Sequence, residues 1–166
     1  MFWSRVLKKF KKGNKEPVFA AVRNDDPEMV KAHALAAETV SDFLEQVQIT
    51  GEHMCCAKLR FRDPDQSERL GEDRFLYIWL NNVVYHPAER LFSGTFFEVP
   101  ADLTKWHQVG QRLGFDPEDI FDWMVNDRGH LYGGYTMRVM RNTLPEQEKH
   151  AYDQHVGVTW WEPLTQ

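Results

Sequence analysis

The sequence has few cysteines and no long apolar run. Its two cysteines, Cys55 and Cys56, are neighbours. Adjacent side chains of a strand point to opposite faces, so we expect neither a disulfide between them nor a shared zinc site. The apolar runs are only a few residues long, whereas a membrane-spanning helix needs roughly 20, and no signal-peptide pattern follows the start. We therefore expect a reduced cytoplasmic protein without a spanning helix.

The motifs of common catalytic and metal sites are also absent. The seven histidines include no His-x-x-x-His pair, and the chain has no Gly-rich phosphate loop. Asp122 and His130 have residue types suited to acid–base chemistry, but three strand pairs separate them on the predicted ladder. His33 falls on the apolar face of its helix, which favours a core histidine. We expect no catalytic residue, metal site or cofactor, and an enzyme with an unrecognised site around Asp122 is the least favoured function.

Charge is divided unevenly along the chain. The formal net charge is −5, yet residues 1–16 carry +5 and the remaining residues carry −10. An acidic body argues against nucleic-acid binding, because affinity for phosphates comes from Lys and Arg. It is compatible with high solubility or with a basic protein partner.

The basic start of the chain has apolar residues at helical spacing. These are Phe2, Trp3, Val6, Leu7 and Phe10. One interpretation is a helix that docks on a membrane surface or a partner, and the favoured one is a chain end that packs its apolar side on the domain. We divide the chain into this basic amphipathic segment (1–16), a single α+β domain (17–157) and a C-terminal tail (158–166).

The pattern from residue 26 onward predicts a long helix followed by strands. Asp26 can cap the helix and Pro27 fits its first position, so we expect a helix from Pro27 to about Gln48. Its predicted apolar stripe is Val30, His33, Ala37, Val40, Leu44 and Val47, flanked by Met29, Ala36 and Phe43. From Met54 the apolar residues alternate, which predicts a strand that buries Cys55, Ala57, Leu59 and Phe61.

The rest of the chain reads as strands joined by turns. Further strands are predicted at residues 74–85, 91–98, 112–115, 120–125 and 130–140, and residues 63–73 are predicted to be an acidic loop. The strand 74–85 is apolar on both faces and should be central. Thr143 and Glu146 resemble a capping box for a short C-terminal helix that Gly157 ends. The predicted fold is α+β, with a strongly bent antiparallel sheet of five or six strands packed on one face against one long N-terminal helix.

One stretch of the sequence resembles a known family. The run Asp119-Ile-Phe-Asp-Trp-Met, followed by Gly133-Gly-Tyr-Thr-Met-Arg138, is similar to the closing motif of the bacterial domain-of-unknown-function 2314 family, the YegJ-like proteins. The similarity extends over most of the chain after the basic start. It departs at Leu76 and Tyr77, where the family tends to have Glu-His. The resemblance implies a fold and a bacterial source, and it implies no established activity.

The closing motif contains the first candidate site. Counting back from the turn at residues 126–129 places Asp122 opposite Gly133, and a glycine there leaves room for a ligand. The functional interpretation is a small ligand site made of Asp122, Trp123, Thr136 and Arg138. The favoured interpretation is structural, with Asp122 accepting hydrogen bonds from backbone or tyrosine groups.

The second candidate site lies on the first two predicted strands. Lys58, Arg60 and Arg62 share one face of the first strand. If the second strand pairs antiparallel, Phe75, Tyr77 and Trp79 lie beside them. Basic groups among aromatic rings can bind a small molecule or a nucleotide. The alternative is cation–π packing within the sheet.

Acidic segments suggest the favoured function. The predicted loop 63–73 contains Asp63, Asp65, Glu68, Glu72 and Asp73, and a second acidic turn contains Asp116, Glu118 and Asp119. We expect a non-catalytic protein-binding module, such as an immunity protein that neutralises a basic cognate toxin by direct binding. The alternative is that both segments are merely solvated loops.

Overall fold

The computed structural model describes residues 22–165, so the predicted amphipathic segment 1–16 lies outside the described residues. The helices of the described range are α2 (Pro27–Glu38), α3 (Val40–Gln48), α4 (Pro64–Leu70), α5 (Tyr135–Thr143) and α6 (Glu146–Val156). The strands are β1 (Met54–Arg62), β2 (Phe75–His86), β3 (Leu91–Phe96), β4 (Arg112–Phe115), β5 (Ile120–Asp127), β6 (His130–Gly133) and β7 (Trp160–Trp161). Two single turns of 3-10 helix, η1 (Ala101–Leu103) and η2 (Pro117–Asp119), precede β4 and β5.

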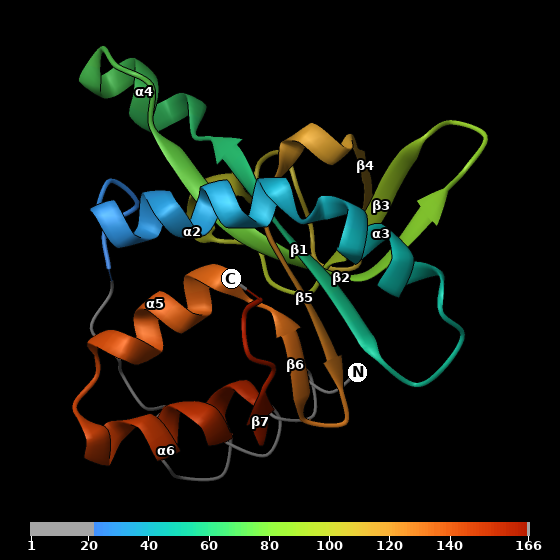
Figure 1. Cartoon of the computed structure of the whole chain (residues 1–166). Coiled ribbons are helices and arrows are strands. Elements are labelled where there is room, and N and C mark those ends of the chain that lie inside the picture. Colours follow the sequence, from blue (N-terminus) through green and yellow to red (C-terminus); the bar gives the residue numbers. More distant parts are fainter. Residues whose placement is uncertain (1–21, 166) are drawn as a thin grey trace, which may run out of the picture.

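The strands form one sheet with helices on both faces (Figure 1). The strand order is β4-β3-β2-β1-β5-β6-β7, and all pairs are antiparallel except β6 with β7. One face packs on α2 and α3 around Phe43, and the other packs on α5 and α6 around Met124. The α+β class, the mainly antiparallel sheet and the central place of β2 are confirmed. The predictions of five or six strands and of one covered face are wrong, because β7 and α5 were not recognised.

The predicted long helix is two helices that meet at Thr39. Thr39 has φ −109° and ψ 15°, which is outside the helical region. Its hydroxyl donates to the carbonyl of Leu35 at 2.8 Å and accepts from Trp123 Nε1 at 3.1 Å. A threonine hydroxyl that bonds locally competes with the helix ladder, so the helix ends here without a glycine or proline.

The buried face of α2 differs from the predicted stripe. Met29, Ala32 and Ala36 are buried, whereas Val30 is 54% exposed and Ala37 is exposed. The two alanines occupy the positions where α2 approaches the sheet, and small side chains permit that close approach. The predicted stripe is therefore wrong at Val30 and Ala37, whereas its members Val40, Leu44 and Val47 pack against the core.

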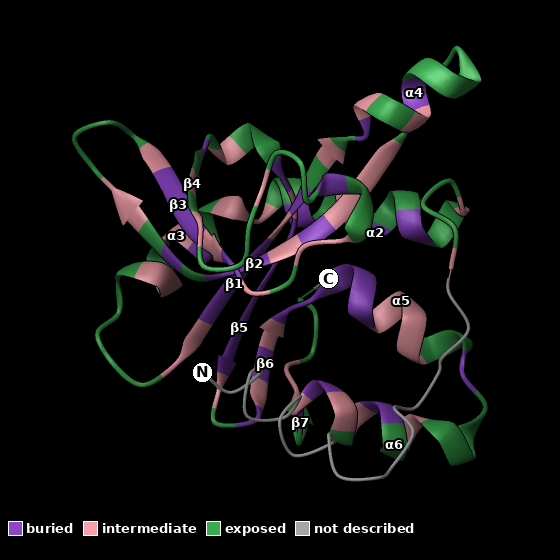
Figure 2. Ribbon diagram, turned by 180° about the vertical axis from the view of Figure 1, so that it is seen from behind, coloured by how far each residue is buried: buried purple, intermediate pink, exposed green. Residues whose placement is uncertain are grey.

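The predicted acidic loop is largely the helix α4. The Asp63 side chain accepts from the amide of Gln66 at 3.0 Å, Pro64 takes the first helical position, and Gly71 ends the helix with φ 69°. These are standard start and stop signals. The helix projects from the end of the β1–β2 ribbon (Figure 1), and most of it is exposed (Figure 2).

The last predicted strand is also wrong beyond Gly133. Gly133 and Gly134 both adopt left-handed backbone conformations, with φ 68° and 65°, and the chain then continues as α5. A Cβ on Gly133 would lie 2.4 Å from the carbonyl oxygen of Trp123, so this position accepts only glycine without rearrangement. Gly133 pairs with Met124 rather than with Asp122.

The C-terminal part adds a helix and a short strand. Gly157 ends α6 with φ 71°, as predicted. The predicted capping box does not form, since Thr143 Oγ1 donates to the carbonyl of Met140. Trp160 and Trp161 pair with β6. In the described part of the chain, none of the helices has the length and apolarity needed to cross a membrane.

Candidate functional site

The strand register unites residues from the two predicted ligand sites. On β1, Lys58 pairs with Trp79 of β2 on one side and with Asp122 of β5 on the other. Thr136, in the first turn of α5, lies above them and contacts both Lys58 and Asp122. We name this group, which also includes Tyr77, the Lys58 cluster: Lys58, Tyr77, Trp79, Asp122 and Thr136.

Asp122 holds the start of α5. It is fully buried, and its carboxylate accepts from the amides of Trp123 at 2.8 Å, Tyr135 at 3.2 Å and Thr136 at 2.8 Å. The Thr136 hydroxyl donates to it at 2.5 Å. The carboxylate thus supplies the cap that Gly134, the residue before α5, has no side chain to provide. The structural role of Asp122 stays a prediction, which the stability of an Asp122→Ala variant tests.

Lys58 is linked to Asp122 through the threonine hydroxyl. Lys58 Nζ donates to Thr136 Oγ1 at 3.3 Å and lies 5.9 Å from the ring centroids of both Tyr77 and Trp79. Burial lowers the pKa of Lys58, and the Asp122 carboxylate opposes that shift. Burial raises the pKa of Asp122, whereas its hydrogen bonds with Thr136 and the positive charge of Lys58 act to lower that pKa. Each charged group therefore stabilises the other in a site shielded from water.

His33 borders the Lys58 cluster from α2. Its ring centroid is 3.6 Å from that of Phe121, and the Phe121 ring is 4.7 Å from Tyr77. His33 Nδ1 lies 3.0 Å from the carbonyl oxygen of Phe121, so Nδ1 carries the proton. Within residues 22–165, no group hydrogen-bonds to the buried Nε2. Burial lowers the pKa of His33, and the nearby charge of Lys58 lowers it further.

Two of the predicted site residues lie elsewhere. Trp123 points to the opposite face, where its ring stacks on Phe43 with centroids 5.3 Å apart. Arg138 Nε donates to the carbonyl of Gly133 at 2.8 Å, and its guanidinium lies 5.5 Å from the Trp161 ring. Thr136, also predicted at this site, does lie beside Asp122. Its hydroxyl and its backbone amide both donate hydrogen bonds to the Asp122 carboxylate.

The remaining basic residues of β1, Arg60 and Arg62, contact groups of the same chain. The guanidinium of Arg60 lies 4.3 Å from the Phe75 ring centroid. Arg62 forms an ion pair with Asp73 at 2.7 Å. The rings of this face are thus in contact with cations of the same chain, as expected for cation–π packing on a sheet.

The predicted acidic partner surface is partly neutralised within the chain. Asp63 is 2% exposed and serves as the cap of α4. Asp65 pairs with Lys105, Glu72 with Arg74, and Asp73 with Arg62. In the described range no ion pair involves Glu68. Glu68 follows Asp65 by three residues and shares its side of α4.

The structure adds an apolar residue that the sequence did not single out. Trp106 is 43% exposed in the segment after η1. Lys105 Nζ lies 5.6 Å from the Trp106 ring, and its ion pair with Asp65 ties this segment to α4. We name the residues Asp65, Glu68, Lys105 and Trp106 the α4 surface.

Both cysteines are free and buried. Burial raises the pKa of the Cys55 thiol to about 12 and also raises the pKa of the Cys56 thiol. Neither thiol forms a nucleophilic thiolate near neutral pH. Across residues 22–165, no three His, Cys, Asp or Glu side chains gather closely enough to hold a metal ion.

Comparison with known proteins identifies the family. A family model described as "Uncharacterized protein conserved in bacteria (DUF2314)" matches residues 26–160. A protein named "Putative ankyrin repeat protein" from Neisseria meningitidis serogroup B is 28% identical over 95 residues, which is 56% of this chain and 36% of the relative. The protein YegJ of Escherichia coli K12 is 33% identical over 72 residues, which is 43% of this chain and 45% of YegJ.

The matches therefore span less than half the length of these curated relatives. No solved structure matches the chain. The family match includes the closing motif of β5, β6 and α5 and the residues of the Lys58 cluster. The chain belongs to the DUF2314 family of bacterial proteins.

Proposed function

We propose that this chain is a non-catalytic protein-binding module that docks a basic protein through the α4 surface. The observation that carries the proposal is Trp106, a tryptophan 43% exposed next to Lys105, which forms an ion pair with Asp65 of α4. Tryptophan is enriched among the residues that dominate binding energy at protein interfaces. A partly exposed tryptophan with charged residues around it has the composition of such a site.

Charge supports a basic partner. Residues 22–165 contain 14 Lys and Arg residues against 24 Asp and Glu residues. Glu68 is the carboxylate of the α4 surface with no ion pair in the described range. Complementary charge speeds association and makes it sensitive to salt. In the finer form of the proposal, the partner is a cognate toxin whose basic active site is covered, which would make the chain an immunity protein.

The relative from Neisseria supports protein binding in general. That relative is named as a putative ankyrin repeat protein. Ankyrin repeat proteins form extended binding surfaces. The cytoplasm is the proposed location, and the two free, buried cysteines suit its reducing conditions.

The test begins with the tagged full chain in its native host. Capture followed by mass spectrometry should recover a basic protein at one-to-one stoichiometry. Glu68→Lys should then slow association with the purified partner, and raising the salt from about 0.05 to about 0.5 M should reduce the difference. Glu148→Lys, at an exposed position of α6 outside both predicted acidic segments, is the matched control. Equal association rates for both variants would contradict docking at α4.

A second proposed function is a small-molecule or nucleotide site at the Lys58 cluster. The unpartnered Nε2 of His33 beside the Lys58 charge favours it, because a buried acceptor without a partner is unusual. Nucleotides titrated while tryptophan fluorescence is followed should quench or enhance the signal of Trp79. The absence of a response at millimolar concentrations would remove this candidate.

A further inference from the structure

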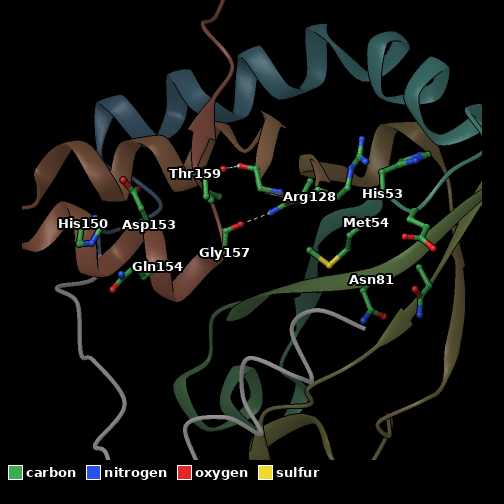
Figure 3. A pocket seen from close by; sticks show the side chains of 14 residues that line it. His53, Met54, Asn81, Arg128, His150, Asp153, Gln154, Gly157 and Thr159 are labelled. Carbon is green, nitrogen blue, oxygen red and sulfur yellow. Dashed lines mark hydrogen bonds between the residues drawn. The ribbon is translucent and has the colours of Figure 1, made fainter.

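A cleft of about 1240 Å³ lies at the end of β1 opposite α4. Figure 3 shows His150, Asp153 and Gln154 of α6 on one side and Met54 and Asn81 on the other. Its location is separate from both the α4 surface and the Lys58 cluster, and its volume is large enough for a ligand of several rings or several residues.

A bulge in β2 forms part of one wall of the cleft. The pairing of β2 with β3 shifts between Asn81 and Val84, and Asn82 has a left-handed backbone with φ 49°. The carbonyl oxygen of Asn82 accepts from both terminal nitrogens of Arg112 at 3.3 Å. Gly94 of β3 packs tightly on this strand, since a Cβ there would lie 2.9 Å from the Cβ of Leu80. The bulge is therefore firmly held by its neighbours.

The opposite side is fixed by Asn126. Its side chain donates to the carbonyl of Gly157 at 3.0 Å and accepts from the amide of Gly129 at 2.7 Å. These two bonds join the β5–β6 turn to the end of α6. Asn126 is 5% exposed. Both ends of its carboxamide are occupied by these bonds, so the group stabilises the cleft wall.

Asn81 differs from Asn126 in one respect. It lines the same cleft and is 6% exposed, yet in the described part of the chain its Oδ1 has no hydrogen-bond partner. A buried amide oxygen without a donor destabilises the fold, and such atoms are rare in proteins. Because Asn81 belongs to the cleft wall, a rotation of its carboxamide would turn this buried oxygen toward the cleft, where a bound molecule can supply the missing donor.

The charged side chains around the cleft are mostly paired. Asp153 forms an ion pair with Arg141 at 2.7 Å, and Arg128 forms one with Asp127 at 3.0 Å. The polar groups that remain include the carboxamides of Asn81, Asn82 and Gln154. A carboxamide both donates and accepts, so it matches a ligand group that does the same.

We propose that this cleft binds an uncharged ligand that presents amide groups, with an N–H donated to Asn81 Oδ1. A peptide main chain and a nucleobase both carry this chemistry. The proposal is independent of the docking surface on α4, because the two sites lie at opposite ends of β1.

The test uses the full chain labelled with ¹⁵N and three kinds of probe. These are capped tripeptides without charged side chains, the nucleosides uridine and adenosine, and citrate as an anion. We expect the peptides or the nucleosides to shift the side-chain amide signals of Asn81 and Asn82. Whichever of the two binds identifies the source of the amide group. Binding of citrate alone, or no binding by any probe, would overturn the proposal.

Variants separate a binding role from a structural one. Asn81→Leu should weaken binding at least about tenfold and leave the melting temperature unchanged or higher, because it removes an unpaired acceptor. Asn142→Leu, at an exposed position of α5, is the matched control and should bind like the parent. If Asn81→Leu lowers the melting temperature while binding is unchanged, Asn81 is structural and the proposal is wrong.

A second variant keeps the proposal testable if Asn81→Leu fails to fold. Asn82→Gly removes a carboxamide at a left-handed position that glycine adopts easily. It should weaken binding of the same probe by several-fold without loss of the folded ¹⁵N spectrum. Parental affinity in this variant, together with unfolded Asn81→Leu, would also overturn the proposal.

Discussion

Replacing Asp122 with alanine removes the cap of α5 and the partner of a buried charge. Three backbone amides and the Thr136 hydroxyl lose their acceptor. Loss of a helix cap costs about 1 kcal/mol, and leaving further buried donors unpaired costs about 1 to 3 kcal/mol more. Asp122→Ala should therefore lower the free energy of unfolding by about 2 to 4 kcal/mol.

Urea unfolding followed by circular dichroism measures this change as a lower midpoint at an unchanged slope. Asp127→Ala, which removes a carboxylate paired with the exposed Arg128, is the control and should stay within about 0.5 kcal/mol of the parent. Adding Lys58→Met to Asp122→Ala should recover part of the loss, because it removes the uncompensated charge. A parental midpoint for Asp122→Ala would refute the structural role of the carboxylate.

Three further predictions concern glycine, histidine and cysteine. Gly133→Ala should destabilise the fold far more than Gly71→Ala in thermal melts, because both have φ near 70° but only Gly133 would place its Cβ 2.4 Å from a backbone oxygen. Burial lowers the pKa of His33, so the stability it contributes is complete above the unfolded pKa of about 6.5 and decreases as the pH falls below it. The free energy of unfolding can be measured by urea melts at pH 7.5 and pH 5, which lie about one unit or more on either side of that value. Its loss between the two pH values should be smaller for His33→Gln than for the parent. Cys55 and Cys56 should react with a thiol reagent at neutral pH only on unfolding, since burial raises both pKa values; rapid reaction of the folded protein would contradict this.

Local signals in the sequence predicted most of the strands. The alternation from Met54 to Arg62 matches β1, and the apolar run from Phe75 matches a central strand. The helix α4 carried readable signals as well, with Asp63 and Pro64 at its start and Gly71 at its end. The density of acidic residues concealed that pattern, and the segment was interpreted as a loop.

Other features depend on contacts between distant residues. The residues of α5 include Tyr, Thr and Val, which favour strands, but the backbone turns at Gly133 and Gly134 and the cap from Asp122 make them a helix. The break at Thr39 depends on Trp123 in the same way. The Lys58 cluster forms because β1 lies between β2 and β5, and the linear order of the strands does not specify that arrangement.

The central claim, protein binding through the α4 surface, is tested most directly by comparing two tryptophans. Trp106 is 43% exposed on the α4 surface and Trp160 is 57% exposed on β7. Titration of the captured partner by isothermal calorimetry should show that Trp106→Ala weakens binding by about 2 kcal/mol or more, whereas Trp160→Ala binds like the parent. Equal affinities for the parent and Trp106→Ala would contradict the account.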